Sequence, residues 1–340
     1  MTLIERVLVV GLGSIGKRHL RIIRELLPDA DIRVLHHRRC TDVPKYSNGC
    51  VRDIRAACDF QPHIAVIASP ATQHLESAVR LAGIGCHLLI EKPLSDSVDG
   101  IDELIAERDR HKVKIQVAYN LRFHSALEFF RNQIQRDRVG KILSVRCEIG
   151  QFLPTWRPGT DYRKGVSANR SLGGGVLLEL SHELDYLRWI FGDVKSLSAN
   201  LKKHSKLEID VEDSAYLTMT FSSKESNEGP TASLCMDFIR HDTTRTCTAI
   251  GENGTLKWNA LTGVVELWEE NADGWEELFI HQHQRDDTYR LEWISFLESV
   301  NEQKETQILI EDGLEVIRLI EAARTSAQNN GEIVILTEGK

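Results

Sequence analysis

Three glycines near the N-terminus constrain the fold of this chain more than any other feature. The segment Gly11-Leu-Gly13-Ser-Ile-Gly16 follows the apolar residues 7–10 and opens a helical pattern. A glycine turn between a buried strand and a helix leaves backbone N–H groups and the positive end of the helix dipole facing outward. The spacing is therefore typical of a turn that binds a pyrophosphate, and an ordinary glycine turn is the alternative. The expected contacts are Gly11, Gly13, Ser14, Ile15 and Gly16.

The first third of the chain alternates short apolar runs with helical stretches. The apolar runs are residues 7–10, 32–35, 64–68, 87–90 and 114–118. Four or five successive apolar residues suit strands that helices cover on both faces. The alternation predicts a doubly wound parallel sheet, a Rossmann domain that binds a dinucleotide, over residues 1–121.

From residue 122 onward, strand-like segments follow one another without intervening helices. They are residues 142–150, 215–221, 232–238, 246–251 and 264–268, and helical stretches at residues 288–303 and 311–329 complete the chain. This order predicts an α+β domain with a large open, mainly antiparallel sheet over residues 122–340, for substrate binding and self-association. The chain as a whole is expected to belong to the α/β class.

Charge, cysteine content and hydropathy exclude several classes of partner. The 340 residues include 50 acids against 42 lysines and arginines, a net charge of −8 that argues against nucleic-acid and anionic-membrane partners. The 7 cysteines form no C-x-x-C pair and are expected as reduced thiols, while His281 and His283 lack the partners of a metal site. No apolar run approaches the roughly 20 residues of a membrane span. We therefore expect a cytoplasmic protein without a metal, whose partner is a small molecule.

The residues after the second predicted strand bear on which dinucleotide is bound. A fold that binds NAD usually presents an acid to the ribose 2′-hydroxyl about 20 residues beyond the glycines. Here the strand ends in Leu35-His36-His37-Arg38-Arg39, without an acid. Because a guanidinium binds phosphate through two parallel hydrogen bonds, we expect NADP rather than NAD, with His36, Arg38 and Arg39 at its 2′-phosphate. NAD, with both arginines as solvated loop charges, is the alternative.

Several further motifs occur along the chain. They are Ala68-Ser69-Pro70 with His74, Glu91-Lys92-Pro93, Tyr119-Asn120-Leu121-Arg122-Phe123, Gly173-Gly174-Gly175 and His182-x-x-Asp185. In this order they resemble the Gfo/Idh/MocA oxidoreductases, the family of glucose-fructose oxidoreductase and inositol dehydrogenase, over nearly the whole chain. The resemblance implies hydride transfer between NAD(P) and a hydroxyl or keto carbon of a sugar, a sugar derivative or a cyclitol. It also implies a homodimer or homotetramer.

The resemblance implies two catalytic residues, and the sequence around each suits its role. Lys92 precedes a proline at the carboxyl end of a predicted strand, where open α/β sheets bind ligands, and it can donate a hydrogen bond to an alkoxide. His182 projects nearly opposite the apolar stripe of a helix predicted over residues 176–191, where it can take a hydroxyl proton or face solvent. The resemblance also implies that Ser69, Pro70, His74 and Glu91 border the nicotinamide.

Substrate contacts are expected from three segments. Asn120 and Arg122 are implied by the resemblance. A loop rich in arginine and aromatic residues contributes Arg157, Tyr162 and Arg163, whose chemistry suits an anionic sugar or a sugar nucleotide and equally an oligomer contact. The commonest family pattern has an acid four residues before the histidine, but position 178 is Leu. We therefore expect Glu179, on the same helical face as His182, to bind substrate hydroxyls or to tune His182, and Asp185 to contact the substrate.

Two other functions remain open at this point. One is a redox-neutral enzyme of the same fold, in which tightly held NAD transiently oxidises a sugar. The other is a non-catalytic regulator that binds a dinucleotide through this fold. The presence of both Lys92 and His182 counts against a regulator.

Overall fold

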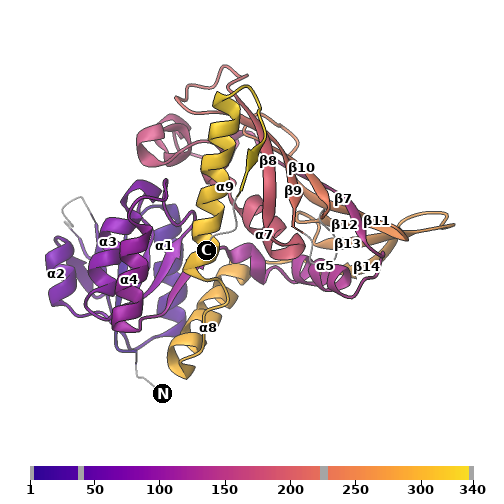
Figure 1. The fold of residues 1–340 in the computed structure, drawn as a ribbon. Helices are drawn as coiled ribbons and strands as arrows, with labels where there is room; N and C mark the ends of the chain where they lie inside the picture. The colour runs from indigo at the N-terminus through magenta and orange to yellow at the C-terminus, as the bar shows by residue number, and fades with distance from the viewer. Residues whose placement is uncertain (1–3, 37–41, 223–228, 337–340) are drawn as a thin grey trace. The chain divides into compact units, whose positions relative to one another are not determined.

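The computed structural model describes residues 4–36, 42–222 and 229–336, and packing divides the chain into two compact units (Figure 1). Unit 1 comprises Met1–Asn120 with Asp286–Ile317, and unit 2 comprises Leu121–Arg285 with Arg318–Lys340. Residues 286–317, which the division by sequence placed in the second domain, belong to unit 1. They do so because apolar side chains of this segment, among them Trp293 and Phe296, are part of the core of unit 1.

Unit 1 is built on a parallel sheet of six strands in the order β3-β2-β1-β4-β5-β6. The strands are β1 (Arg6–Val10), β2 (Asp31–Leu35), β3 (Gly49–Val51), β4 (Ile64–Ile67), β5 (His87–Glu91) and β6 (Ile115–Ala118). This confirms the predicted doubly wound sheet. The order reverses between β1 and β4, so the carboxyl ends of these two strands flank the crevice where open α/β sheets bind ligands.

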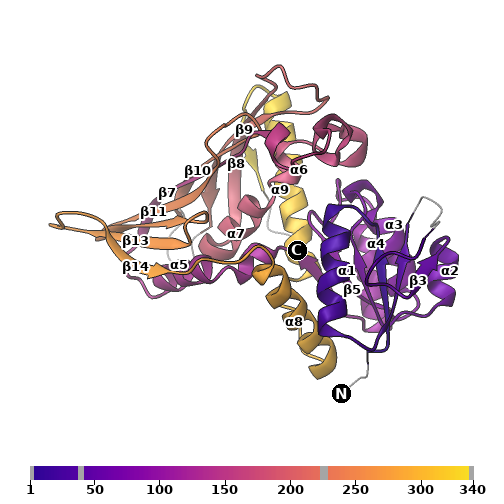
Figure 2. The same cartoon turned by 180° about the vertical axis from the view of Figure 1, so that it is seen from behind.

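The helices of unit 1 pack on the sheet or on one another through their buried side chains. They are α1 (Ser14–Leu26), α2 (Ile54–Asp59), α3 (His74–Ala82), α4 (Ile101–His111) and α8 (Asp287–Glu302). All four residues of β4 are buried, as expected for a strand covered on both faces. Helices α1 and α8 lie side by side (Figure 2), and Ile23 and Phe296 meet in the same apolar cluster as Val7.

Unit 2 contains a sheet of nine strands in the order β14-β13-β12-β11-β7-β10-β9-β8-β15. The strands are β7 (Ile142–Gly150), β8 (Val194–Lys202), β9 (Ser214–Phe221), β10 (Thr231–Asp237), β11 (Thr244–Gly251), β12 (Gly254–Asn259), β13 (Val264–Glu269), β14 (Glu276–Ile280) and β15 (Val334–Ile335). Among the described strand pairs of this nine-stranded sheet, only β7 and β10 are parallel, which confirms a mainly antiparallel sheet. Burial alternates along β10, so one face of the sheet is covered and the other is open.

The helices of unit 2 include α5 (Ser125–Gln135), α6 (Val176–Glu179) and α7 (His182–Phe191), and α9 (Ile310–Gln328) begins in unit 1 and ends in unit 2. The helix predicted over residues 176–191 is thus two helices, because the chain leaves helical geometry at Leu180, with φ −102° and ψ 26°. Leu177, Leu178 and Leu180 are all buried, so apolar residues surround this turn rather than forming one stripe. The inference that Glu179 and His182 share one helical face is therefore wrong.

Cysteine chemistry differs from the expectation at one position. Cys58, Cys86, Cys147, Cys235 and Cys247 are free thiols, whereas Cys50 is disulfide-bonded. The expectation of reduced thiols is wrong for Cys50 because sequence spacing does not reveal which cysteines the fold brings together.

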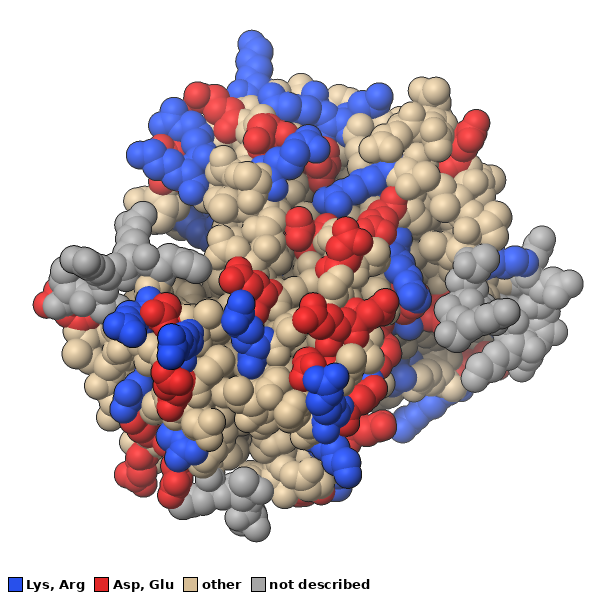
Figure 3. All heavy atoms as spheres, turned by 60° about the vertical axis from the view of Figure 1, so that its left-hand side comes forward, with Lys and Arg blue, Asp and Glu red and all other residues tan. Residues whose placement is uncertain are grey.

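Surface charge and helix hydropathy are relevant to the nucleic-acid and membrane partners considered above. Acidic and basic side chains are interspersed over the face shown in Figure 3. Across the part of the chain that the structure describes, no helix combines the length and the hydropathy required to cross a membrane.

Candidate functional site

The glycine turn after β1 has the geometry of a phosphate cradle. Gly11 adopts φ +92°, and a Cβ there would lie 2.6 Å from the carbonyl oxygen of Ala68. A Cβ on Gly16 would lie 2.1 Å from the carbonyl oxygen of Gly11, whereas a Cβ on Gly13 would meet nothing within 4 Å. The first and third glycines therefore permit close packing of the turn, and the second leaves open space above the backbone.

The start of α1 supplies the electrostatics for an anion. Gly13 caps the helix without a side-chain hydrogen bond, and the first turn contains no acidic residue. The N–H groups of that turn and the helix dipole therefore favour a negative charge. Ser14 is exposed and Ile15 half-buried at this point. The turn as a whole fits the pyrophosphate of a dinucleotide.

The end of β2 lies next to this turn, because the backbone N–H of Gly11 donates to the carbonyl oxygen of Leu35 at 2.9 Å. His36 follows the strand and is half-buried. Arg38 and Arg39 lie outside the described residues, so their expected contact with a 2′-phosphate stays a prediction. The position suits the adenosine ribose of a dinucleotide held in the glycine turn.

His74 joins the ends of β4 and β5. Its ring is buried, with Nε2 at 2.8 Å from the carbonyl oxygen of Ser69 and Nδ1 at 3.0 Å from that of Pro93. Burial lowers the pKa of His74, which opposes its charged form. The side chain therefore connects the Ser69-Pro70 segment to the Lys92-Pro93 segment, and its contact with a nicotinamide remains a prediction.

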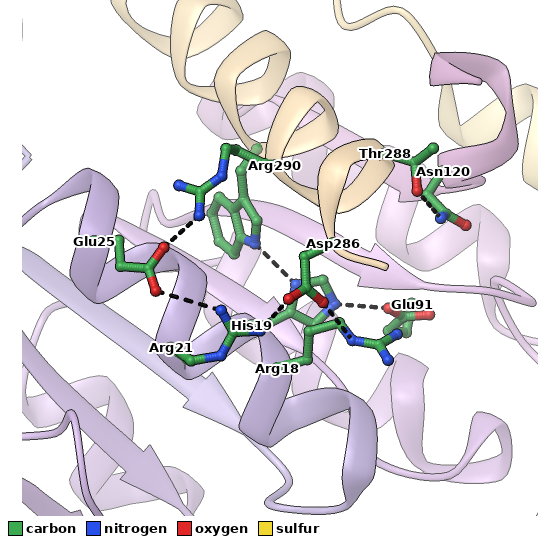
Figure 4. A network of polar contacts seen from close by, with 10 residues as sticks. Arg18, His19, Arg21, Glu25, Glu91, Asn120, Asp286, Thr288 and Arg290 are labelled. Atoms are coloured by element: carbon green, nitrogen blue, oxygen red, sulfur yellow. Dashed lines mark hydrogen bonds and ion pairs between the residues drawn. The ribbon is translucent and has the colours of Figure 1, made fainter. Parts of the chain in front are cut away.

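Glu91 ends β5 and holds the backbone of the following lysine. Its Oε1 lies 2.7 Å from Nε2 of His19, and its Oε2 accepts the backbone N–H of Lys92 at 3.1 Å. Glu91 and His19, whose contact is drawn in Figure 4, are buried, whereas Lys92 is half-buried at the carboxyl edge of the sheet. The carboxyl ends of β1 and β5 thus present a phosphate cradle and an ammonium group at the same edge of one sheet.

Asn120 and Arg122 have partners within their own units. The Asn120 amide donates to the hydroxyl of Thr288 at 2.7 Å in unit 1. In unit 2, Arg122 forms a bidentate pair with Asp185, from Nη2 to Oδ1 at 2.6 Å and from Nε to Oδ2 at 3.0 Å. These side chains are buried, so their contact with substrate stays a prediction while their structural contacts are established.

His182 is the first residue of α7, and its ring is half-buried. Asp185 lies one turn further along the same helix, and its pair with Arg122 ties α7 to the segment that precedes α5. Glu179 ends α6 and accepts the hydroxyl hydrogen of Ser167 at 2.6 Å. The helix that carries His182 is therefore anchored by a buried ion pair, and Glu179 is held by its own neighbour.

The arginines of the loop at residues 153–170 differ in their surroundings. Arg163 donates to Asp161 at 2.8 Å and to Glu208 at 3.1 Å, and hydrogen bonds to these carboxylates raise its pKa. The hydroxyl of Tyr162 accepts the backbone N–H of Glu208 at 3.2 Å. Arg157 is exposed. Arg163 thus orders the loop through its own acids, which leaves Arg157 as the better candidate to bind an anionic substrate.

Comparison with known protein families decides what kind of protein carries these groups. The model described as the NAD-binding Rossmann fold of an oxidoreductase family matches residues 5–119, and the model of that family's C-terminal alpha/beta domain matches residues 131–335. The chain belongs to the Gfo/Idh/MocA oxidoreductase family. Its N-terminal unit therefore contains the family's NAD-binding domain, and the resemblance inferred from the motifs is confirmed.

Curated relatives of this Gfo/Idh/MocA chain include an uncharacterized oxidoreductase and dehydrogenases with named substrates. The uncharacterized oxidoreductase YrbE of Bacillus subtilis is 24% identical over 338 residues, which are 94% of this chain and 93% of that protein. The inositol 2-dehydrogenase/D-chiro-inositol 3-dehydrogenase of Shouchella clausii is 26% identical over 218 residues, 59% of this chain and 58% of that protein. The levoglucosan dehydrogenase of Pseudarthrobacter phenanthrenivorans is 29% identical over 142 residues, 41% and 35% of the two chains.

Solved structures share the fold along almost the whole chain. Levoglucosan dehydrogenase in complex with NADH has a TM-score of 0.84 at 19% identity, covering 98% of this chain and 99% of that one. The WlbA dehydrogenase of Bordetella pertussis in complex with NADH and UDP-GlcNAcA has a TM-score of 0.81 at 18% identity, covering 100% and 99%. At these identities the likeness establishes the common fold.

The Gfo/Idh/MocA motifs fall on both units. The glycine turn, the Ser69-Pro70 segment, Lys92 and Asn120 belong to unit 1, whereas His182 and the remaining substrate candidates belong to unit 2. Joint action of Lys92 and His182 on one substrate therefore stays a prediction. Among the described residues, no group of histidine, cysteine and acidic side chains is arranged to hold a metal ion.

Sequence reasoning missed His19 and Trp293, although one signal was available. His19 lies on the apolar face of α1, at helical spacing from Ile22 and Ile23, and it is fully buried. A titratable side chain on an apolar helix face requires a buried partner, because an unpaired polar group is costly there. The identity of that partner depended on the tertiary contact with α8, which no local pattern contains.

Proposed function

We propose that this chain is an NAD(P)-dependent dehydrogenase that transfers a hydride between nicotinamide and a hydroxyl or keto carbon of a sugar, a sugar derivative or a cyclitol. The observation that carries the proposal is the position of Lys92 after β5, at the same sheet edge as the glycine turn after β1. The names of two relatives, a levoglucosan dehydrogenase and an inositol dehydrogenase, support this substrate class.

In this proposal the cofactor supplies the hydride chemistry, and the chain supplies binding, orientation and proton transfer. The glycine turn binds the pyrophosphate through backbone N–H groups at the start of α1. Lys92 donates a hydrogen bond to the reacting substrate oxygen, which stabilises negative charge that develops there. His182 exchanges the hydroxyl proton, as a side chain that titrates near neutrality can.

The finer substrate assignment rests on the loop of unit 2. An anionic or nucleotide-linked sugar would bind the exposed guanidinium of Arg157, because Arg163 is already held by Asp161 and Glu208. Asn120, Arg122, Tyr162, Glu179 and Asp185 remain proposed substrate contacts. Self-association to a homodimer or homotetramer likewise remains a proposal, for which the open face of the nine-stranded sheet offers a surface.

The preference for NADP is proposed from the chain after β2. The strand ends at Leu35 and is followed by His36 rather than by an acid, and the sequence continues with His37 and the two arginines. A ribose 2′-hydroxyl would lack its usual carboxylate partner, whereas a 2′-phosphate would gain cations. Titration of the purified protein with NADPH and NADH tests this, and tighter binding of NADH would contradict the preference.

The decisive experiment for the function pairs cofactor binding with turnover. The protein is titrated with NADH and NADPH, a denatured portion is assayed for retained cofactor, and turnover is measured with myo-inositol, levoglucosan and UDP-linked uronic acids. Turnover with exchangeable cofactor is expected. Retained NAD without net turnover would favour the redox-neutral cycle, and failure to bind either dinucleotide would overturn the enzymatic proposal.

Two lysines provide a matched pair of variants. Lys92→Met removes the proposed donor at the carboxyl edge of the sheet. Lys114→Met makes the same change just before β6, at the amino edge, where Nζ donates to the carbonyl oxygen of Gln303 at 3.2 Å. We expect loss of turnover by about 100-fold or more in the first variant and near-normal turnover in the second.

A further inference from the structure

A series of buried hydrogen bonds connects α8 to Lys92 through α1 and β5. The indole Nε1–H of Trp293 donates to Nδ1 of His19 at 2.8 Å, and Nε2 of His19 lies 2.7 Å from Oε1 of Glu91. The other carboxylate oxygen of Glu91 accepts the backbone N–H of Lys92 at 3.1 Å. We call Trp293, His19 and Glu91 the Trp-His-Glu triad; Figure 4 shows the contact between His19 and Glu91.

The triad determines which nitrogen of His19 carries the proton. An indole N–H can only donate, so Nδ1 of His19 must accept. The ring proton therefore resides on Nε2, where it points to the Glu91 carboxylate. A second proton on Nδ1 would face the indole N–H and remove the hydrogen bond from Trp293. The two hydrogen bonds thus fix His19 in one tautomer, with the ring proton on Nε2.

The surroundings of the triad favour this arrangement. The charged or titratable groups packed around it from α1 and α8 are Arg18, Asp286, Tyr289 and Glu292. Arg18 and Asp286 pair with each other, from Nε to Oδ1 at 3.1 Å. Glu292 is fully buried, and burial together with the nearby Glu91 raises its pKa well above the usual range, which favours its neutral form.

We propose that His19 is a positioning residue for Lys92: fixed by Trp293, it fixes Glu91, which in turn holds the backbone N–H of Lys92. On the other side of Lys92, the carbonyl oxygen of Pro93 lies against His74, so buried histidines restrain both flanks of the lysine. A side chain whose backbone is held in this way loses fewer conformers when it engages a substrate oxygen. The proposal rests on the proposed function, in which Lys92 acts on that oxygen.

The first test is independent of catalysis and reads the ring of His19 directly. Nitrogen-15 spectra of the histidine rings are recorded between about pH 5 and pH 8, the range in which histidine normally titrates. His19 is assigned by comparison with His19→Gln. We expect a protonated Nε2 and an unprotonated Nδ1 throughout. In Trp293→Phe, Nδ1 loses the indole donor, so the ring proton should no longer be confined to Nε2. A proton on Nδ1 in the wild type would overturn the proposal.

The second test reads the hydrogen bond that reaches Lys92. Amide exchange of Lys92 is measured in the wild type, His19→Leu, His19→Gln and Phe296→Leu. Loss of the contact to Glu91 in His19→Leu should speed the exchange about tenfold, as loss of one hydrogen bond would. Gln keeps an N–H donor and should restore the slow rate. Phe296, which stacks on Trp293 edge to face at 5.9 Å, controls for lost packing. Equal exchange in the wild type and His19→Leu would contradict the proposal.

The third test connects positioning to rate. With myo-inositol or levoglucosan as substrate, His19→Leu should lower kcat by roughly 10- to 100-fold with little change in the dissociation constant of NADH, because a misplaced group costs mainly in the reacting state. His19→Gln should recover most of kcat, and Phe296→Leu should keep it. An unchanged kcat in His19→Leu would overturn the positioning role. If the wild type turned over none of myo-inositol, levoglucosan and UDP-linked uronic acids, the proposed function would fail, and the ring and exchange measurements would still decide the role of His19.

Discussion

The glycines of the turn after β1 are of two kinds: some pack against neighbouring backbone, and one has open space beside it. Gly11 and Gly16 are required because a Cβ at either would collide with backbone atoms, whereas Gly13 has open space around it. We therefore predict that a ligand, rather than the fold, requires glycine at position 13. This distinction is testable, because a ligand requirement changes affinity and leaves stability unchanged.

Gly13→Ala should preserve the unfolding temperature and weaken binding of NADH by about tenfold or more, since its methyl group would occupy the approach of the pyrophosphate. Gly49→Ala is the control, because a Cβ at Gly49 also meets nothing within 4 Å and lies at the start of β3. Fluorescence titration with NADH measures both variants. Equal affinities for the two would show that Gly13 faces no ligand.

The buried ion pair between Arg122 and Asp185 is a single contact whose removal should destabilise the folded chain. Only 6% and 1% of these side chains are exposed. Arg122→Met should lower the free energy of unfolding by about 3–5 kcal/mol, because it removes the cation that pairs with a buried carboxylate. Urea unfolding measures the loss. The double variant with Asp185→Leu should recover much of it, whereas an Arg163→Met control at an exposed pair should have little effect. A small effect in both single variants would contradict this account.

At the scale of elements, the histidine that caps α5 should make the stability of the fold depend on pH. His124 caps α5, and its Nδ1 accepts the backbone N–H of Leu127 at 3.4 Å. The ring lies edge to face against Trp258 and near His283. Burial, followed by the charges of His283 and Arg245, lowers the pKa of His124 to about 4. The folded state therefore holds His124 neutral, while the unfolded chain binds a proton near pH 6.5.

The sign of the pH effect follows from this lowered pKa. Stability from the neutral ring is fully present above about pH 6.5 and is lost as pH falls toward 4, because only the unfolded state takes up the proton. Between pH 8 and pH 5 this group should reduce the free energy of unfolding by about 2 kcal/mol. Urea unfolding at both pH values tests it. His124→Asn, which keeps a capping acceptor, should show a correspondingly smaller loss, and an identical loss would rule out His124 as the source.

Helix α8 belongs to unit 1, although the division by sequence placed it in the second domain. It lies more than 160 residues after β6 in sequence, yet Trp293, Phe296 and Val300 are buried in the core of unit 1. Its contact with α1 also includes ion pairs of Arg18 and Arg21 with Asp286 (Figure 4). A Rossmann sheet whose last strand ends at Ala118 therefore depends on a distant segment to cover α1.

At the scale of the whole molecule, this dependence predicts how fragments behave. Residues 1–120 alone should lack cooperative unfolding, because the surface that α8 covers would be exposed. A fragment in which residues 286–317 are joined to residues 1–120 should unfold cooperatively in urea. Circular dichroism and fluorescence measure both fragments. Cooperative unfolding of residues 1–120 alone, with an unchanged midpoint, would show that α8 is dispensable.

The sequence alone determined the fold class, the glycine turn, the family motifs and most strands, because these depend on local spacing and on short apolar runs. It predicted β9, β10 and β13 within two residues, whereas β3, β8, β12, β14 and β15 were not predicted. The break at Leu180, the partner of Asn120 and the placement of α8 were decided only by tertiary packing. The same holds for His19, whose tautomer and contacts depend on Trp293, more than 270 residues away. Local patterns report which face of an element is apolar, but only the folded chain determines which polar groups meet beneath that face.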